Sequence, residues 1–411
     1  MICGLDVHKR KIVSSIIELS VRNGPIQART SYVSFFERTL DGMDKLCEFL
    51  KERNIKTVIM ESTGPYSTTV YYFLESQGFD VWMAHPRDNK PRSQKKTDVS
   101  DAERLARGFV SGSIRTYKLP LDPKIRKLRM LTRTRKKLVE KRVSMKNMII
   151  RTFDEACIDI KDVFKSVGKG ALVFIDGLVR GMSLDEIIRR WPRLAGKREK
   201  LEKITSERLS TESLAVLGSL LKIIETLNGE IEKIDRMIEN ILAELGEDTQ
   251  LLLTIPGVGM HASAILLAEI GNIGRFSSPK KLASYAGLVP SVYQSGDKVV
   301  YGGLRKDCNR RLRWIFYEIA LSAIRLSPRL RAFYDRLIER GKAKKQALIA
   351  VARKIAVGVW HILTRKVRWN ERIEKRLFRP RKRRVSKFTV REAIALLRNA
   401  GYIVIKSGSS I

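Results

Sequence analysis

Apolar and polar residues alternate in short runs over the first 85 residues of the 411-residue chain, and they follow a helical period from about residue 120 onwards. The short runs predict five strands and two helices before residue 85, and a further helix that begins at Asp98. The predicted strands cover residues 2–7, 11–18, 32–36, 57–61 and 80–84, and the predicted helices cover residues 40–52 and 66–76. The resulting order of elements is βββαβαβα.

Four acidic residues lie at or near the ends of these elements. Asp6 is in the first strand, and Glu61 ends the fourth. Asp98 and Asp101 begin the last helix, three residues apart and therefore on one face. Acids at these places are the pattern of the RNase H-like fold, in which the first and fourth strands are neighbours and the last helix packs across that edge. The sequence therefore predicts an α/β RNase H-like (RuvC-like) N-terminal domain with its four acids close together.

Four carboxylates in one place would raise one another's pKa, so we expect a cation between them. Oxygen ligands alone favour Mg²⁺ or Mn²⁺, and two such ions would clamp the attacking and leaving oxygens of a phosphodiester displacement. Each acid also has an ordinary explanation. Asp6 could be a surface charge at a strand end, Glu61 a cap of the next helix, and Asp98 an acid that complements a helix dipole. The combination in this element order favours the metal centre.

The chain carries 80 Lys and Arg against 44 Asp and Glu, a formal net charge of +36. A charge of this size favours nucleic acid as the partner. A thermophile's surface and a membrane-surface protein are the alternatives, but thermophile surfaces tend to balance Lys with Glu, and no lipid-anchor motif is present. The basic loop before Asp98 contains Arg87, Lys95 and Lys96, which we predict to contact phosphates; the alternative is a merely solvated loop.

The four cysteines are far apart and form no C-x-x-C pair, so neither a zinc site nor a disulfide framework is indicated. The apolar runs are too short for a membrane span, and the N-terminus has no apolar signal region. We therefore expect a cytoplasmic, nucleoid-associated protein without a membrane partner.

Long helices are predicted beyond about Pro120, with a heavily basic stretch over residues 125–153. A heptad seam between residues 206 and 245 predicts a coiled coil, within the chain or between protomers, and helix packing inside the chain is the alternative. The seam residues are Leu217, Leu221, Ile224, Leu227, Ile231, Ile234, Ile238, Ile241 and Leu245. The predicted domains are a catalytic domain over 1–118, this helical region over 119–247, a mainly α domain over 248–370 and a basic extension over 371–411. The extension contains a basic run over 379–384, and one helix and one strand are expected within 389–406.

Residues 252–260 carry a helix-hairpin-helix signature at the start of the mainly α domain. Its Gly257 and Gly259 would expose backbone N–H groups at the start of a helix over 261–270, where one phosphate can bind without its base being read. A plain tight turn between two helices is the alternative.

The stretch from Gly287 to Gly296 reads G-L-x-P-x-x-x-x-S-G. Together with the four acids, it resembles the DEDD transposases of the IS110 family, also called bridge recombinases, which are relatives of the Piv invertases. The acids match the family's RuvC-like tetrad, and this stretch matches its C-terminal transposase domain. The resemblance covers roughly residues 1–365.

The resemblance implies a recombinase that cuts and rejoins the DNA of an insertion sequence. It implies that Ser295 is the nucleophile, that a structured bridge RNA chooses the DNA sites, and that the protein works as a homo-oligomer. Lys298 and Arg305 of the same region are predicted nucleic-acid contacts. From the sequence alone, Ser295 is an ordinary turn residue. The alternative functions are a RuvC-like Holliday-junction nuclease, which needs the acids but not Ser295, and a non-catalytic nucleic-acid-binding protein, which needs neither.

Overall fold

The fold was analysed in a computed structural model that describes residues 1–21, 26–85, 97–119, 122–204, 209–295, 298–370, 373–374 and 390–401. The chain forms two compact units, Met1–Asp235 and Arg236–Ile411. The finer division at residues 118, 247 and 370 stays a prediction.

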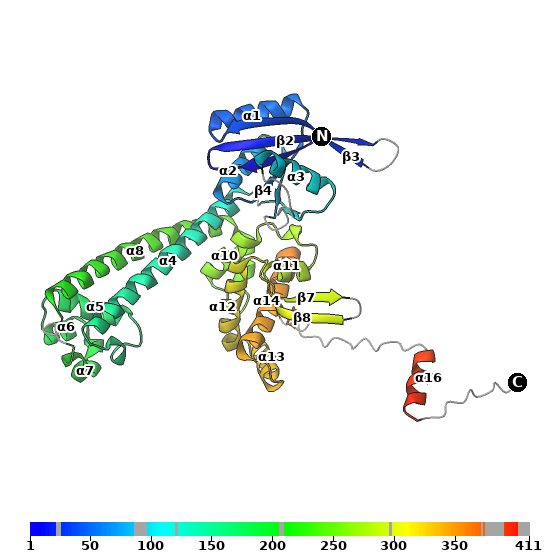
Figure 1. Ribbon diagram of the computed structural model, residues 1–411. Coiled ribbons are helices and arrows are strands. Elements are labelled where there is room, and N and C mark those ends of the chain that lie inside the picture. Colours follow the sequence, from blue (N-terminus) through cyan, green and yellow to red (C-terminus); the bar gives the residue numbers. More distant parts are fainter. Residues whose placement is uncertain are drawn as a thin grey trace. The chain divides into compact units, whose positions relative to one another are not determined.

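The first unit begins with a six-stranded mixed sheet in the order β3-β2-β1-β4-β5-β6 (Figure 1). β1, β2 and β3 are antiparallel neighbours, β4 runs parallel to both β1 and β5, and β6 is antiparallel to β5. The strands are β1 (Ile2–Val7), β2 (Lys11–Val21), β3 (Ile26–Glu37), β4 (Thr57–Glu61), β5 (Asp80–Ala84) and β6 (Thr116–Tyr117). The predicted adjacency of the first and fourth strands is confirmed. β2 and β3 are longer than predicted, and β6 was not predicted because two residues carry no period.

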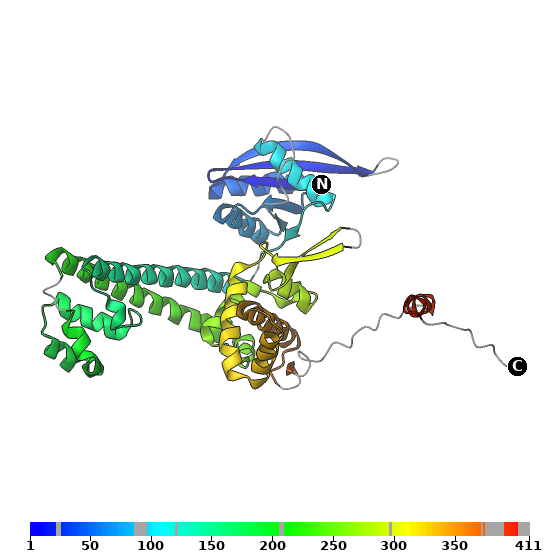
Figure 2. The same ribbon diagram turned by 60° about the horizontal axis from the view of Figure 1, so that its bottom comes forward.

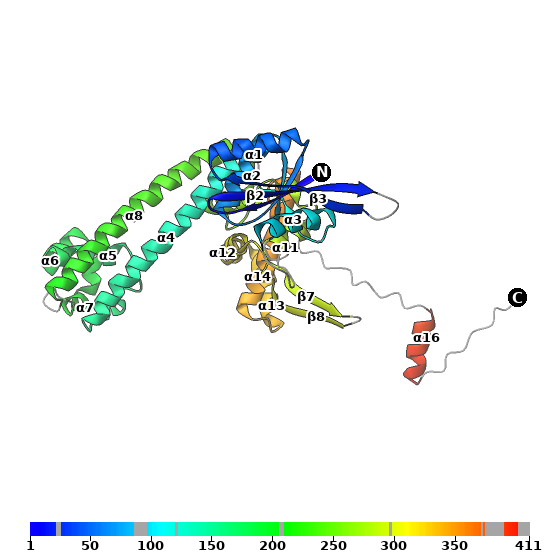
Figure 3. The same cartoon turned by 45° about the horizontal axis from the view of Figure 1, so that its top comes forward.

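Helices cover both faces of this sheet, with α1 and α2 on one face and α3 on the other (Figure 3). Their bounds are α1 (Leu40–Glu52), α2 (Pro65–Ser76) and α3 (Asp98–Val110). Leu5 and Val7 of β1 belong to the same core as Leu46 of α1, whereas Leu105 of α3 packs with Ile59 of β4 on the opposite face. Strand residues alternate between the two cores, as the period of two requires. The predicted order βββαβαβα is therefore confirmed.

Two long helices, α4 (Pro123–Glu155) and α8 (Thr211–Glu244), lie side by side and antiparallel (Figure 2). Arg135 of α4 donates to Asp235 of α8, and Arg142, farther along α4, donates to Asn228, farther back along α8. Four positions of the predicted seam are buried within the single chain: Leu217, Ile224, Ile231 and Ile238. Helix packing inside the chain thus accounts for these four positions, and a coiled coil between protomers stays a prediction.

Between α4 and α8 the chain forms a small helical cap with its own core. Phe153 of α4, Phe174 of α5 and Leu217 of α8 are buried in that core. The cap consists of η1 (Ile160–Asp162), α5 (Lys169–Val179), α6 (Leu184–Arg190), η2 (Pro192–Lys197) and α7 (Arg198–Glu202). Residues 168–193 belong to it.

The second unit is mainly helical and carries a β-hairpin, β7 (Pro290–Ser295) and β8 (Lys298–Leu304). Its helices are α9 (Gly246–Leu253), α10 (Met260–Ile270), η4 (Ile273–Arg275), α11 (Pro279–Tyr285), α12 (Arg310–Leu326), α13 (Pro328–Glu339), α14 (Lys344–Arg365) and α16 (Val390–Asn399). The mainly α prediction is confirmed, although it did not include the hairpin. The helix expected in the extension is α16, while the expected strand and the basic run over 379–384 lie outside the described residues.

Among the described residues, α14 is the one helix long and apolar enough to cross a membrane by length and composition. It packs against α9, α11, α12 and α13, and the residues it buries include Val351, Ile355 and Val359. Its apolar composition is therefore that of a core helix.

Candidate metal centre and serine hairpin

Asp6 lies near the end of β1, on the face that α3 covers. Its neighbours Leu5 and Val7 point into the opposite core, so the alternation of the strand places Asp6 with Gly4 beneath α3. The residue is only 8% exposed. A carboxylate this buried requires compensating partners.

Glu61 ends the neighbouring strand β4. β1 and β4 are paired in parallel up to Leu5 and Met60, so the next residue on each strand is Asp6 or Glu61. Ile59, two residues before Glu61, packs with α3, and Glu61 is therefore on the same face as Asp6. The register of this strand pair brings the first two acids together.

The start of α3 brings in the other two acids. A capping box starts the helix, in which Thr97 Oγ1 accepts from the Ser100 N–H and Ser100 Oγ accepts from the Thr97 N–H. Asp98 and Asp101 therefore lie in the first helical turn. Asp101 is 8% exposed, and its carboxylate accepts a hydrogen bond from Arg104, one turn later.

Gly4 explains how α3 approaches β1 so closely. A Cβ atom at Gly4 would lie 1.9 Å from the carbonyl oxygen of Ala102, a residue of the first turns of α3. Side chains of any size are excluded there, because such a contact is far shorter than atoms allow. The missing side chain lets the first turns of α3 rest on β1 beside Asp6.

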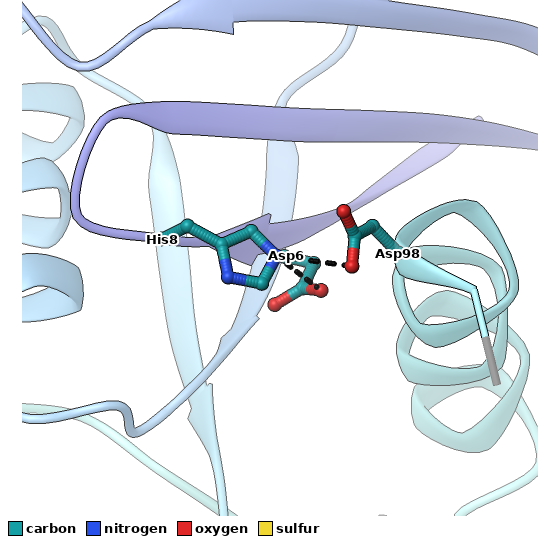
Figure 4. Close-up of side chains that lie close together, drawn as sticks. All are labelled: Asp6, His8 and Asp98. Carbon is teal, nitrogen blue, oxygen red and sulfur yellow. Dashed lines mark ion pairs between the residues drawn. The ribbon is translucent and has the colours of Figure 1, made fainter.

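A histidine completes the arrangement (Figure 4). His8 Nε2 lies 3.1 Å from Asp6 Oδ2 and 3.2 Å from Asp98 Oδ1, between the two carboxylates. Lys11, the first residue of β2, donates from its Nζ to the second oxygen of Asp98. The sequence pattern did not identify His8, Lys11 or Arg104 as part of the site. The spacing of Asp6 and His8, two residues apart where β1 ends, was the available signal.

The electrostatics of the site follow from this crowding. Burial is the largest cause that raises the pKa of Asp6; the charge of His8 opposes it, and the carboxylates of Asp101, Asp98 and Glu61 raise it further. The pKa of Asp98 is instead lowered, chiefly by the hydrogen bond from Lys11. The charges of the other three predicted acids therefore all act on Asp6.

The donor set fits a divalent cation. Ligand atoms of Asp6, His8 and Asp98 all lie within 4.8 Å of one another, which is the spacing of groups that bind one ion. The carboxylates of Glu61 and Asp101 are also close enough to raise the pKa of Asp6. Two of the acids are paired with the cationic side chains Lys11 and Arg104, so the site already attracts positive charge.

Ser295 lies in the second unit, as the last residue of β7, opposite Lys298 of β8. Arg305 follows the hairpin; its Nη1 donates to Ser284 Oγ at 3.0 Å, and its Nη2 lies 3.9 Å from the Asp307 carboxylate. The structure describes the backbone of Ser295 and Lys298 but not their side chains. Arg87, Lys95 and Lys96 lie outside the described residues, so their predicted phosphate contacts stay predictions.

The predicted helix-hairpin-helix turn lies between α9 and α10. Val258 N–H donates to Ile255 O at 3.0 Å, and Gly257 has a φ of +84°, as glycine after proline in a type II turn does. A Cβ at Gly257 would lie 2.8 Å from the Ala323 nitrogen of α12, so packing alone requires glycine there. Gly259 caps α10 and is exposed. Phosphate binding at this turn stays a prediction.

Family models match both parts of the chain. A model described as "Transposase", for the DEDD type of IS110 elements, matches residues 3–158. The model described as "Transposase IS116/IS110/IS902 family" matches residues 249–335.

Individual relatives agree with these models. The transposase for insertion sequence element IS1111A of Coxiella burnetii is 25% identical over 319 residues, 75% of this chain and 78% of that protein. The uncharacterized 44.8 kDa protein of insertion element IS116 from Streptomyces clavuligerus is 25% identical over 358 residues, 82% of this chain and 87% of that protein. The pilin gene-inverting protein of Moraxella bovis is 34% identical over 140 residues, 34% of this chain and 42% of that protein.

Two solved structures were also matched. The fowlpox virus resolvase, solved with Holliday junction DNA, is 14% identical and covers 27% of this chain and 99% of its own, with a TM-score of 0.23. Thermus thermophilus RuvC is 11% identical and covers 28% of this chain and 99% of its own, with a TM-score of 0.23. The two family models describe one kind of protein and match one unit each, and the chain therefore belongs to the IS116/IS110/IS902 family of transposases.

Proposed function

We propose that this transposase cuts and rejoins the DNA of an insertion sequence with a divalent-metal centre at Asp6, Glu61, Asp98 and Asp101 and a serine nucleophile at Ser295. The observation that carries the metal centre is the convergence of the acids on His8, with Asp6 and Asp98 both within 3.2 Å of its Nε2. Mg²⁺ or Mn²⁺ bound there would stabilise the charge that develops on a phosphodiester during displacement.

The residues of the chain have distinct parts in this proposal. The adjacent strands β1 and β4 supply the carboxylates of Asp6 and Glu61, and the first turn of α3 supplies those of Asp98 and Asp101. Lys11 and Arg104 orient two of these carboxylates through hydrogen bonds. Ligands held by rigid elements keep their geometry better than ligands on loops.

Ser295 would act by nucleophilic displacement. A bond forms between its hydroxyl oxygen and the phosphorus, the bond between the phosphorus and the leaving deoxyribose oxygen breaks, and the leaving oxygen takes up a proton. The hydroxyl end of another strand then displaces the serine, which reverses the first step and joins the strands. Support for this role is the G-L-x-P-x-x-x-x-S-G motif in a family whose serine at this place is the nucleophile.

The partners follow from the family and from the charge. DNA is the substrate, and a structured bridge RNA would choose the sites on it, bound by a homo-oligomer. The formal charge of +36 supports two polyanionic partners. A folded RNA should copurify with the protein, and protein freed of RNA by nuclease should no longer recombine at its chosen site. Unchanged recombination after that treatment would argue against RNA guidance.

The decisive experiment for Ser295 is the migration of labelled DNA on a denaturing gel after incubation with protein and magnesium. Wild type should give a shifted, protease-sensitive band, because DNA is linked covalently to protein. Ser295→Ala should lose this band and still bind DNA. Ser291→Ala is the matched control, because Ser291 belongs to the same strand but its hydroxyl donates to Gly303 O within the hairpin, so the band should remain. Cleaved ends without any shifted band would favour the junction-nuclease alternative.

The metal centre has its own test in strand transfer. Asp98→Asn should reduce the rate by at least about 10²-fold, the typical cost of losing one electrostatic partner of a transition state. Asp44→Asn is the control, because Asp44 is an exposed acid of α1, which covers the opposite face of the sheet. A near-normal rate of Asp98→Asn with magnesium present would contradict the metal assignment.

A further inference from the structure

We propose that His8 is a nitrogen ligand of the metal centre, and that this ligand makes the centre prefer Mn²⁺ to Mg²⁺. The inference rests on the proposed function, because it requires that the four acids bind a metal ion. It adds a residue outside the acidic tetrad, and it names the ion.

The position of His8 is fixed by the backbone. His8 follows the end of β1, and its N–H donates to Lys11 O at 2.9 Å, which closes the turn into β2. The ring contacts of His8 with Asp6 and Asp98 place its imidazole on the side of the sheet on which Asp6 lies. Figure 4 shows one ring nitrogen of His8 facing both the Asp6 carboxylate and the Asp98 carboxylate.

The distances match those of ligands around one ion. Neighbouring ligand atoms of an octahedral ion with bonds of about 2.1 Å lie about 3.0 Å apart. His8 Nε2 lies 3.1 Å from Asp6 Oδ2 and 3.2 Å from Asp98 Oδ1. The three atoms are thus spaced as adjacent corners of one coordination shell, with His8 at the middle corner.

Two observations distinguish a ligand from a simple ion-pair partner. The Nε2 atom is buried and satisfies the geometry of no hydrogen bond, although two carboxylates are this close. The charge of Asp98 and Asp101 is already matched by Lys11 and Arg104. A buried nitrogen within ion-pair distance of two carboxylates, without a hydrogen bond of full geometry to either, is placed where one ion would contact all three groups.

Ligand chemistry gives the preference between the ions. Mg²⁺ binds oxygen ligands and retains several waters, whereas imidazole suits transition metals. Mn²⁺ accepts carboxylates as Mg²⁺ does. Because it is a first-row transition-metal ion, it also binds an imidazole nitrogen more readily than Mg²⁺ does. A centre of three or four carboxylates with one imidazole therefore favours Mn²⁺.

The test measures metal binding by the full-length protein, without DNA and without activity as the readout. Electron paramagnetic resonance of free Mn²⁺ gives the affinity of the protein for Mn²⁺, and competition by Mg²⁺ gives its affinity for Mg²⁺. Electron spin echo modulation detects nitrogen bound directly to Mn²⁺. The chain has four histidines, so a nitrogen signal is assigned by substitution. Wild type should show the nitrogen signal, and His8→Ala should lose it.

His8→Ala should also weaken Mn²⁺ binding by at least about tenfold, since losing even an outer partner of a ligand costs that much. Its Mg²⁺ affinity should stay within about twofold, because Mg²⁺ depends on the oxygen ligands. Lys9→Ala is the matched control, because Lys9 is the exposed neighbour of His8 in the same turn, and it should bind both ions as wild type does.

Asp6→Asn separates this inference from the proposed function. If Asp6→Asn loses Mn²⁺ while His8→Ala binds it like wild type, or if wild type shows no nitrogen signal, the centre exists and the role of His8 is wrong. If wild type and Asp6→Asn both fail to bind Mn²⁺, both the centre and the role of His8 are wrong.

Discussion

Gly4 determines how the acids of α3 meet those of the sheet. Because a Cβ at this position would lie 1.9 Å from Ala102 O, Gly4→Ala must displace α3 from β1. Overpacking of this kind costs about 1–3 kcal/mol. We expect Gly4→Ala to lower stability by that amount in urea unfolding, and to reduce strand transfer because Asp98 and Asp101 move away from Asp6.

A second glycine provides the control for this prediction. Gly229 lies within α8 with nothing near its would-be Cβ, so Gly229→Ala should stabilise the protein by about 0.5–1 kcal/mol through helix propensity. Strand transfer should be unchanged. If both substitutions had the same effect on the free energy of unfolding, the contact between Gly4 and α3 would not be the cause.

The sequence identified the four acids as site candidates, but it did not identify the residues that pair with them or position them. Asp6, Glu61, Asp98 and Asp101 could be identified because each lies at the end of a patterned element. Lys11 could not, since its pairing with Asp98 depends on the position of α3 relative to β2. Arg104 follows Asp101 by three residues on the same helix, so the sequence spacing contained that pair although it was not used. That position 4 must be glycine follows only from the structure, because the contact that excludes a side chain there is made by α3.

At the scale of elements, the interface between α4 and α8 can be tested by substituting a buried and an exposed isoleucine of α8. Ile231 of α8 is 4% exposed and Ile223 of the same helix is 45% exposed. Ile231→Ala should cost about 2–5 kcal/mol, the usual range for a buried isoleucine, and Ile223→Ala should cost far less. Urea unfolding of both variants checks this. Equal losses would mean that the exposed side of α8 is also covered, as it would be by another protomer.

In the second unit, a buried carboxylate joins α10 to α12. Glu269 is 1% exposed, and its Oε2 accepts from Asn309 Nδ2 at 2.9 Å. The same Asn309 caps α12 by accepting from the Arg311 and Leu312 N–H groups. The cap and the helix contact therefore depend on each other.

Replacing this carboxylate should show the dependence. Glu269→Ala removes the closer of the two acceptors of Asn309 Nδ2, the other being Tyr285 Oη at 3.4 Å, and should cost about 1–3 kcal/mol. Glu269→Gln retains an acceptor and should cost less. Thermal unfolding of both variants is the measurement. Glu318→Ala is the control, an exposed acid of α12 that should change stability by less than about 0.5 kcal/mol. A loss in Glu269→Ala no larger than that of the control would remove Glu269 from this role.

The order of elements was predictable wherever apolar residues recur with the period of a strand or of a helix. The five predicted strands and the helices α1 to α3 follow from alternation and three-and-four spacing. The hairpin of β7 and β8 was missed because Gly302 and Gly303 interrupt the alternation of β8. The seam of α8 was found, but the sequence left open whether its partner lay within the chain or in another protomer, because any apolar stripe satisfies the same pattern.

At the scale of the whole molecule, the positive charge is unevenly distributed between its two longest helices. α4 contains twelve Lys and Arg and three Asp and Glu, whereas α8 contains three and seven. The side of α4 opposite its buried residues carries the exposed cations Lys127, Lys137 and Lys141. With 33 residues, α4 is about 50 Å long, enough to follow roughly one and a half turns of duplex.

Salt dependence of DNA binding tests whether this helix contacts phosphates. With six to ten contacts, affinity for duplex DNA should fall about 10³- to 10⁵-fold between about 50 and about 200 mM salt. Replacing Lys127, Lys137 and Lys141 together by Gln should lower the slope of log affinity against log salt by about three, because each phosphate contact contributes about one. The control removes the three cations of α8, Lys222, Lys233 and Arg236, which changes the net charge equally but leaves α4 intact. Binding measured with EDTA present excludes cleavage. Equal slopes for the two triple variants would mean that net charge, and not the face of α4, determines binding.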